Sequence, residues 1–418
     1  MGMLDSAAGA APTTATRLRS GIALLGPAFV AAIAYVDPGN VATNIAAGAT
    51  YGYMLVWVIV AANLMAFVVQ YLSAKLGLVT GQSLPEALRE RMPRAARLGY
   101  WGQAELVAMA TDLAEVLGGA IALRILFGIP LLIGGVITGA VSMALLALQN
   151  RYGQRPFERA VTGLLAVIAL GFMAGLLVAP PSPAGTLGGL VPRFSGTESV
   201  LLAAGMLGAT VMPHAVYVHS ALARDRHGRQ TGPLRERLLT ANKFDVGLAM
   251  LLAGAVNLGM LLLAASALQG SATGESLEGA HAAVSGNLGP AIGLLFAIGL
   301  LASGLSSTAV GCYAGAVVMD GLLRRRIPLL ARRLITLIPA LVVLALGVDP
   351  TRALVLSQVV LSFGIPFALV PLVLLTARRD VMGRYANGRW ITGAAVAIAA
   401  TVVTLNIALI YLTATGQG

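Results

Sequence analysis

The chain has 418 residues, of which 57% are hydrophobic and only 11% are charged. A soluble globular protein carries charge on roughly a quarter of its residues, so this sequence lacks the polar side chains to cover a water-facing surface. The net charge of +11 would by itself fit a nucleic-acid partner, but the basic residues are distributed as in a membrane protein.

Apolar runs of near 20 residues recur along the chain, and each is long enough to cross a hydrocarbon core of about 30 Å as a helix. We predict an all-α integral membrane protein without soluble domains, in which residues 1–16 form a disordered cytoplasmic tail and residues 17–418 a single transmembrane domain. The longest polar stretches, 223–242 and 270–286, are predicted loops. The eleven predicted transmembrane helices are residues 21–47, 53–77, 98–127, 131–149, 157–179, 197–222, 243–269, 287–321, 330–348, 352–376 and 390–414.

Lysine and arginine fall almost entirely on one side of the membrane when successive loops are assigned to alternate sides. Only Arg124, Arg193 and Arg352 of the 28 basic residues fall on the other side, which leaves 25 together. This is the positive-inside bias. It predicts a multi-pass protein of the cell membrane with a cytoplasmic N-terminus and an external C-terminus.

Two predicted spans contain a proline near mid-membrane. The first contains Asp37-Pro38-Gly39-Asn40 and the sixth contains Met212-Pro213-His214. Proline removes a backbone donor and clashes with the preceding turn, so both helices are expected to unwind locally. Because spans one and six cross in opposite directions, they indicate an inverted repeat, about 21–179 against 197–376, with an extra helix at about 390–414. Paired broken helices predict a substrate site at the midplane.

The polar groups at these breaks form an unusual donor set. Asp37 is a carboxylate that costs about 2.5–3.5 kcal/mol at mid-bilayer and therefore faces a cavity or a partner. Asn40 adds an amide oxygen, Met212 adds a thioether, and the unwound backbone frees carbonyls near Ala34 and Ala209. All-oxygen cages suit Mg²⁺ and Ca²⁺, whereas sulfur favours first-row transition metals. A core-filling role is the alternative for Met212, and its place in the matching break favours a ligand.

A row of titratable residues indicates a proton relay. The acids of the third span are spaced seven and three residues apart, which puts them on one helical face. Two arginines lie at the start of the ninth span, and two histidines follow the break in the sixth span. Structural ion pairs are the alternative interpretation. The residues are Glu105, Asp112, Glu115, Arg332, Arg333, His214 and His219.

Three uncharged polar residues also lie within spans, and they either line the pathway or bond across helices. They are Gln70, Asn257 and Gln358. The single cysteine, Cys312, lies in an apolar span and is interpreted as a small buried hydrophobe.

With Asp37-Pro38-Gly39-Asn40 and Met212-Pro213-His214, the chain resembles the Nramp family of proton-coupled divalent metal transporters. Further matching stretches are 104–107, 112–115, 302–307 and 357–360, and the likeness extends over essentially all eleven spans. The resemblance implies a LeuT-type 5+5 inverted repeat, alternating access, and import of Mn²⁺, with Fe²⁺ and similar ions as further cargo. It also implies a transporter rather than an enzyme.

The resemblance implies a role for each matching position. The metal ligands would be Asp37, Asn40, Met212 and the backbone of Ala34 and Ala209, with Gln358 joining in some conformations. The proton route would use His214, Asp112, Glu115, Arg332 and Arg333. Metal ions and protons would be cargo, with no resident cofactor and no obligate protein partner. Ala215 departs from the asparagine of many members, whereas the metal motifs that Mg²⁺ or Al³⁺ relatives lose are kept.

The sequence argues against two other functions. A sodium-coupled amino-acid carrier on the same fold would place Asp37 beside the substrate carboxylate, which the fixed negative charge would repel. An intramembrane metalloprotease needs a His-Glu-x-x-His pattern, and the pair His214 and His219 has neither the glutamate nor the spacing.

Overall fold

A computed structural model describes residues 26–270, 276–325 and 327–415, so the predicted tail of residues 1–16 lies outside the described residues. All regular structure within these ranges is helical. The elements are α2 (Pro27–Ile33), η1 (Ala34–Val36), α3 (Pro38–Tyr51), α4 (Val56–Thr80), α5 (Leu84–Arg89), α6 (Arg94–Phe127), α7 (Leu131–Tyr152), α8 (Gln154–Met173), α9 (Gly175–Val178), α10 (Pro183–Gly188), α11 (Gly196–Thr210), α12 (Pro213–His227), α13 (Gly232–Ala267), α14 (Leu277–Leu288), α15 (Pro290–Leu323), α16 (Leu329–Ala345), α17 (Pro350–Ala377), α18 (Arg379–Met382), η3 (Gly383–Tyr385) and α19 (Arg389–Ala414).

Each of the eleven predicted spans coincides with a helix or with a pair of half-helices. Among the described residues, nine helices are long and apolar enough to cross a membrane. The first span falls short of that measure because it is divided into α2, η1 and α3. The ninth, α16, falls short because it has only 17 residues.

The predicted loops are wrong in part. Residues 223–242 include the end of α12 and the beginning of α13, and residues 270–286 include most of α14. Polar residues do not prevent a helix from continuing into the water-facing region, because only one face of such a helix needs an apolar partner. The seventh span therefore continues as helix well before residue 243.

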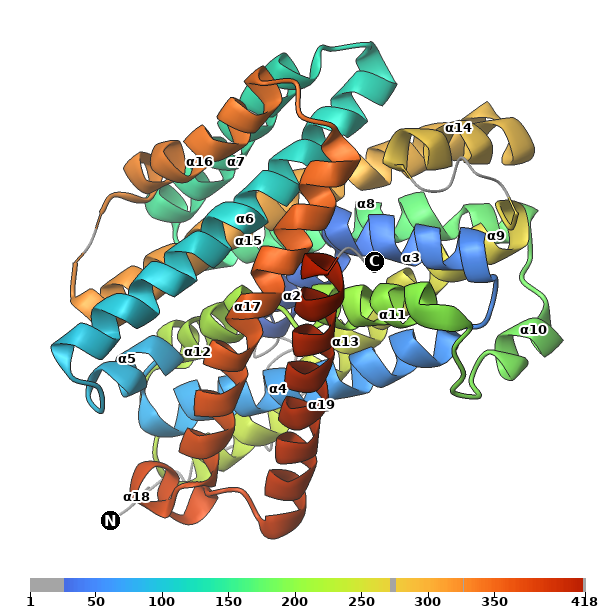
Figure 1. Ribbon diagram of the computed structural model, residues 1–418. Helices are drawn as coiled ribbons and strands as arrows, with labels where there is room; N and C mark the ends of the chain where they lie inside the picture. Colours follow the sequence, from blue (N-terminus) through green and yellow to red (C-terminus); the bar gives the residue numbers. More distant parts are fainter. Residues whose placement is uncertain (1–25, 271–275, 326, 416–418) are drawn as a thin grey trace, which may run out of the picture.

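The helices form two groups that cross each other (Figure 1). Helices α6, α7, α15 and α16 run together as one tilted group, and α3, α4, α8 and α11 form a second group beside it. The backbones of α6 and α15 approach each other closely inside the first group, where a Cβ atom on Gly304 would lie 2.6 Å from the backbone nitrogen of Gly119. Small residues are the usual means of bringing membrane helices into close contact.

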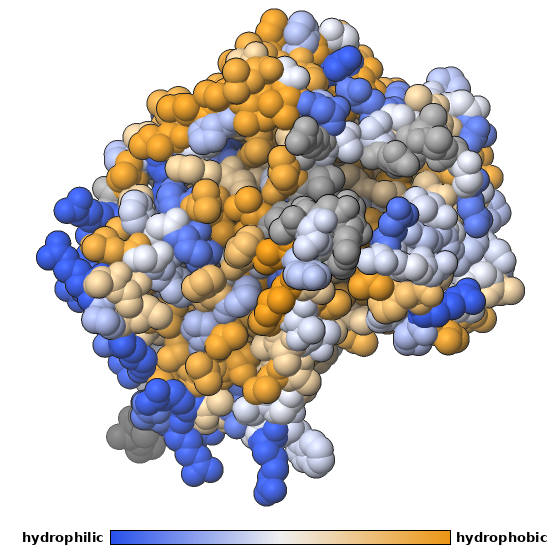
Figure 2. All heavy atoms as spheres, viewed as in Figure 1, coloured by the Kyte–Doolittle hydropathy of each residue, from blue (hydrophilic) through white to orange (hydrophobic). Residues whose placement is uncertain are grey.

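The outer surface of the helix bundle is apolar. Large side chains such as Leu64, Leu170 and Leu251 are 65–70% exposed, and Figure 2 shows hydrophobic residues covering much of the face over α6, α7 and α16. Lipid tails are as apolar as leucine, so these side chains lose nothing in a bilayer. The surface thus supports the prediction of a membrane protein.

Both predicted helix breaks are confirmed, and each has a local cause. Asp37 is extended (φ −71°, ψ 169°) and caps α3, whose first residue is Pro38. Met212 is extended (φ −76°, ψ 130°) and precedes α12, which begins at Pro213. Proline is well suited to the first helical position because its missing N–H would have no intrahelical partner there. In each span the proline therefore begins the second half-helix.

Candidate functional site

The two helix breaks contact each other through Asn40. Its side-chain Nδ2 donates a hydrogen bond to the carbonyl oxygen of Ala209, 2.9 Å away at the end of α11. The Thr210 hydroxyl lies 3.4 Å from Asn40 Oδ1 and also donates to the Met206 carbonyl at 2.7 Å. One asparagine at the start of α3 therefore links the break in the first span to the break in the sixth span.

Asp37 lies at this junction and is fully buried. Its Oδ1 accepts hydrogen bonds from the backbone N and the side-chain Nδ2 of Asn40, at 2.8 and 2.7 Å. Its Oδ2 is buried and has no hydrogen-bond partner among the described residues. A buried carboxylate is strongly unfavourable unless it is paired. The unpartnered oxygen is therefore a position where a cation would be favoured.

Gln358 of α17 extends its amide over Gly39, beside this carboxylate. A Cβ atom on Gly39 would collide with Gln358 Nε2 and would lie 3.1 Å from Asp37 Oδ2. Glycine is thus needed for this close approach. Neither amide atom of Gln358 has a hydrogen-bond partner among the described residues. Of the two roles that the sequence left open for Gln358, the structure favours lining the junction.

Met212 and Ala34 lie in the predicted breaks and are both fully buried. Met212 packs within the apolar core, and Ala34 begins the short helix η1 that leads to Asp37. Within the described ranges, no three His, Cys, Asp or Glu side chains gather into a metal-binding cluster. A metal at this junction would therefore depend on amide, carbonyl and thioether donors around a single carboxylate, and the ligand roles of Met212 and Ala34 stay predictions.

A cavity of about 230 Å³ leads from this junction to one end of the molecule. Its inner wall includes Gly39 and Gln358, and its outer wall includes Glu278 of α14 and Asp349 before α17. Carboxylates at the outer end favour cations over anions. Glu278 is paired with Arg124 at 3.5 Å, which offsets part of this negative charge. The cavity reaches the residues around Asp37 from this end.

The acids of α6 meet the arginines of α16, in the ion pairs that the sequence left open as the alternative interpretation. Arg333 lies 2.8 Å from Asp112 Oδ2, and both side chains are almost completely buried. Arg332 Nη2 lies 2.7 Å from Glu105 Oε1. The Ser142 hydroxyl on α7 accepts a further hydrogen bond from Arg333 Nε at 2.7 Å. Two of the three acids are therefore matched by an arginine.

Glu115 is the acid without a matching arginine. It is fully buried, and neither carboxylate oxygen has a hydrogen-bond partner among the described residues. His214, in the first turn of α12, is also buried, and both of its ring nitrogens lack partners in the same part of the chain. Glu115 and His214 are thus the two predicted relay residues whose side chains form neither a hydrogen bond nor an ion pair within the described part of the chain.

Gln70, His219 and Asn257 bond across helices around the first break. Gln70 of α4 donates to the Tyr35 hydroxyl at 2.6 Å and contacts His219 Nδ1 at 2.8 Å. Asn257 of α13 donates to the Tyr35 carbonyl at 2.7 Å and accepts from Asn44 Nδ2 at 2.8 Å. Tyr35 and Asn44 were not among the predicted site residues, although their positions flanking the first break were a usable signal.

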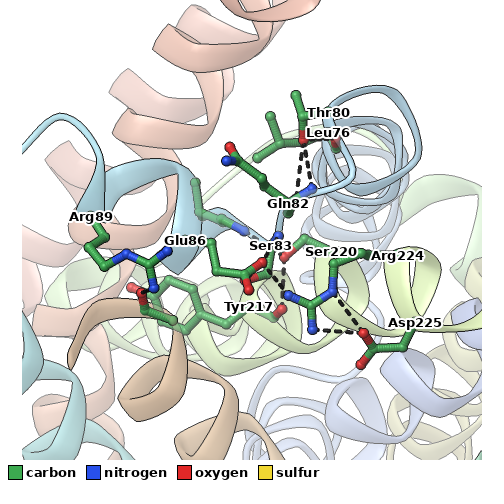
Figure 3. A network of polar contacts seen from close by, with 12 residues as sticks. Leu76, Thr80, Gln82, Ser83, Glu86, Arg89, Tyr217, Ser220, Arg224 and Asp225 are labelled. Carbon is green, nitrogen blue, oxygen red and sulfur yellow. Dashed lines mark hydrogen bonds and ion pairs between the residues drawn. The ribbon is translucent and has the colours of Figure 1, made fainter. Parts of the chain in front are cut away.

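A second polar network fixes α12 at its far end (Figure 3). Arg224 forms ion pairs with Glu86 of α5 and with Asp225. The Ser220 hydroxyl accepts a hydrogen bond from the backbone amide of Leu84 at 3.0 Å. Glu86 also accepts from the Ser83 amide at 2.7 Å, which completes a capping box. A cavity of about 530 Å³ lies beside these residues and reaches Arg332. It lies at the opposite end of α15 from the acidic cavity.

The chain has clear relatives over almost its whole length. Residues 28–412 match the family model "Natural resistance-associated macrophage protein-like", abbreviated Nramp. A "Divalent metal cation transporter MntH" of Mycobacterium tuberculosis is 64% identical over 97% of this chain and 95% of its own. A manganese transporter of Eremococcus coleocola superposes with a TM-score of 0.85 at 32% identity, covering 96% of this chain and 88% of that one.

More distant structures share the fold alone. A nucleobase-cation-symport-1 family transporter superposes with a TM-score of 0.61 at 19% identity, over 93% of this chain and 91% of that one. The architecture is therefore the LeuT-type fold with broken first and sixth spans, as predicted. With the family model spanning nearly all of the chain, the protein belongs to the Nramp family.

Proposed function

We propose that this protein imports divalent transition-metal ions together with protons across the cell membrane, with Mn²⁺ favoured and Fe²⁺ also carried. The observation that carries the proposal is the buried Asp37 carboxylate, whose Oδ2 has no partner among the described residues at the junction of two broken helices. The names of the relatives support it, since they describe divalent metal cation and manganese transporters.

The proposed metal site uses one charge and several neutral donors. Asp37 supplies the charge, Asn40 and Gln358 supply amide oxygens, and Met212 supplies sulfur. A thioether beside oxygen donors favours Mn²⁺ and Fe²⁺ over Ca²⁺ and Mg²⁺. The backbone carbonyls of Ala34 and Ala209 complete the proposed ligand set.

We assign proton movement to the residues between the metal site and the cavity of about 530 Å³ beside Arg332. Glu115 and His214 have unused hydrogen-bonding capacity, and the paired acids continue from there toward Arg332, which lines that cavity. Buried acids, histidine and arginine in membrane spans commonly form such relays. The proposed route consists of His214, Glu115, Asp112, Arg333, Arg332 and Glu105.

The proposed topology follows from the charge distribution. The N-terminus is cytoplasmic and the C-terminus external, and the two repeats of the single transmembrane unit, about 21–179 and 197–376, move against each other in alternating access. Metal ions and protons are the cargo. The bilayer is the expected surrounding, and we expect no resident cofactor, no nucleic acid and no obligate protein partner.

Transport by the purified chain in proteoliposomes tests the proposal. An inward proton gradient should accelerate Mn²⁺ uptake, and Mn²⁺ addition should acidify the lumen. Empty liposomes and liposomes with the Asp37→Ala variant are the controls. Uptake of an amino acid driven by Na⁺, without Mn²⁺ transport, would replace this function with that of the other carriers on the same fold.

A further inference from the structure

A cleft between the first turns of α6 and the end of α15 lies apart from the metal and proton residues. It has a volume of about 590 Å³. Hydrophilic residues gather at this edge of the molecule, next to the hydrophobic face of α6 (Figure 2). None of the residues proposed for metal or proton transport lines it. Its lining includes Arg94, Arg97, Leu98, Trp101, Arg325 and Ile327.

The cleft carries positive charge without a matching acid. Arg94, Arg97 and Arg325 contribute three guanidinium groups, and none of the described residues that line the cavity is a carboxylate. None of the three side chains forms an ion pair within the described part of the chain. Other arginines at the same end are paired, such as Arg224 with Glu86. The cleft therefore favours an anion.

Two donors in the cleft wall lack an acceptor. Arg97 Nε and Trp101 Nε1 are both buried from solvent without a hydrogen-bond partner among the described residues. They are four residues apart in α6, so they lie on the same helix face. Buried donors are nearly always satisfied in native proteins, and an unsatisfied pair calls for a missing acceptor. A phosphate oxygen is an acceptor that both groups bind well.

The apolar part of the lining favours a lipid over a free anion as the ligand. Leu98 is 47% exposed and Ile327 is 38% exposed, and both border the basic groups. Tryptophan and arginine at the end of a membrane helix are typical of the headgroup level of a bilayer. We propose that this cleft binds the headgroup phosphate of an anionic phospholipid, whose acyl chains lie on Leu98 and Ile327.

Lipid titration of the purified full chain in detergent tests the proposal. Its readouts are lipid retention by native mass spectrometry and the thermal unfolding midpoint. Dioleoylphosphatidylglycerol should bind at least about tenfold more tightly than dioleoylphosphatidylcholine, because charge-assisted bonds to an anionic headgroup are the strong ones. Inorganic phosphate should leave the midpoint unchanged. Neither readout depends on transport, so failure here leaves the proposed function unaffected.

Three substitutions localise the effect. Arg97→Gln and Trp101→Phe should each abolish most of the preference for phosphatidylglycerol, and Trp101→Phe removes only the N–H donor while keeping the ring. Arg379→Gln, at an exposed arginine of α18 outside the cleft, should leave the preference unchanged. Equal retention of the two lipids, or a preference that survives both cleft variants, would overturn the proposal. An equal midpoint shift with inorganic phosphate would instead identify a free-anion site.

Discussion

The side-chain amide of Asn40 bonds at once to Asp37 and to the Ala209 carbonyl. Its Nδ2 lies 2.7 Å from Asp37 Oδ1 and 2.9 Å from the Ala209 oxygen. In this arrangement the Asn40 amide engages one lone pair of the Ala209 carbonyl, and the second lone pair stays available to a ligand. One side chain therefore connects the buried carboxylate of the first span to the end of α11 in the sixth span.

Asp37 is expected to be indispensable for transport. Asp37→Ala removes the single carboxylate at the junction and should abolish saturable Mn²⁺ uptake in proteoliposomes. Asp37→Asn keeps the shape and the hydrogen-bonding capacity but loses the charge, so it should be equally inactive. The uncharged variants should insert and fold, because each relieves the cost of a buried charge. Near-normal uptake by either one would refute the site.

Gly39→Ala is expected to weaken metal binding without removing any donor. The new Cβ would collide with the Gln358 amide beside Asp37 Oδ2, so Gln358 must move away. We expect the apparent KM for Mn²⁺ to rise about tenfold, while expression and thermal stability change little. Gly205→Ala is the matched control, since its Cβ would meet no atom closer than 3.9 Å. Equal KM values for the two variants would show that Gln358 takes no part in binding.

Neutralising Glu115 and neutralising Asp112 are expected to have different effects on the stability of the protein. Glu115→Gln removes the acid without an arginine partner and should reduce metal-linked lumen acidification more than Mn²⁺ binding. Asp112→Asn should do the same and also leave Arg333 buried without its counter-ion, which costs about 3–5 kcal/mol. Lumen acidification, Mn²⁺ binding and thermal unfolding separate these effects. Full proton flux and unchanged pH dependence in both variants would identify the acids as structural partners only.

The fold was predictable because its main signals are local. Apolar runs marked the spans, and Asp37-Pro38 and Met212-Pro213 marked the breaks, since proline acts on its own helix. The pairing of Arg332 and Arg333 with acids of α6 was left open by the sequence as the alternative to a relay, since buried charges need opposite partners. Helix ends at the water-facing surface were predicted less well, as the early beginning of α13 shows.

The contacts made by side chains from distant spans could not be derived from the pattern. The sequence pattern did not indicate that the Asn40 amide bonds to the Ala209 carbonyl. It also did not indicate that Gln358 lies over Gly39. Both contacts depend on how the two helix groups cross. The same holds for Tyr35, which was recognisable only as a neighbour of the break. Sequence periodicity identifies the buried face of a helix but not the residue opposite it.

Met212→Ala is expected to change selectivity more than Mn²⁺ affinity. Sulfur interacts well with first-row transition metals but weakly with Ca²⁺ and Mg²⁺, which prefer oxygen. The Met212 side chain is fully buried at the break in the sixth span. Its removal leaves space for a water molecule, while Asp37 and Asn40 remain at the site. A water oxygen in place of sulfur makes the site harder. The variant should retain Mn²⁺ transport, lose Cd²⁺ affinity more sharply, and begin to admit Ca²⁺.

Competition between the metals measures this change directly. Mn²⁺ uptake is recorded against rising Ca²⁺ for the wild type and for Met212→Ala, and the variant should be inhibited at Ca²⁺ concentrations that the wild type tolerates. Met206→Ala is the matched control, because Met206 is equally buried but lies in α11 before the break. Loss of Ca²⁺ rejection in Met212→Ala alone assigns selectivity to its sulfur. Unchanged rejection would mean that Met212 packs the core and that the size of the cavity excludes Ca²⁺.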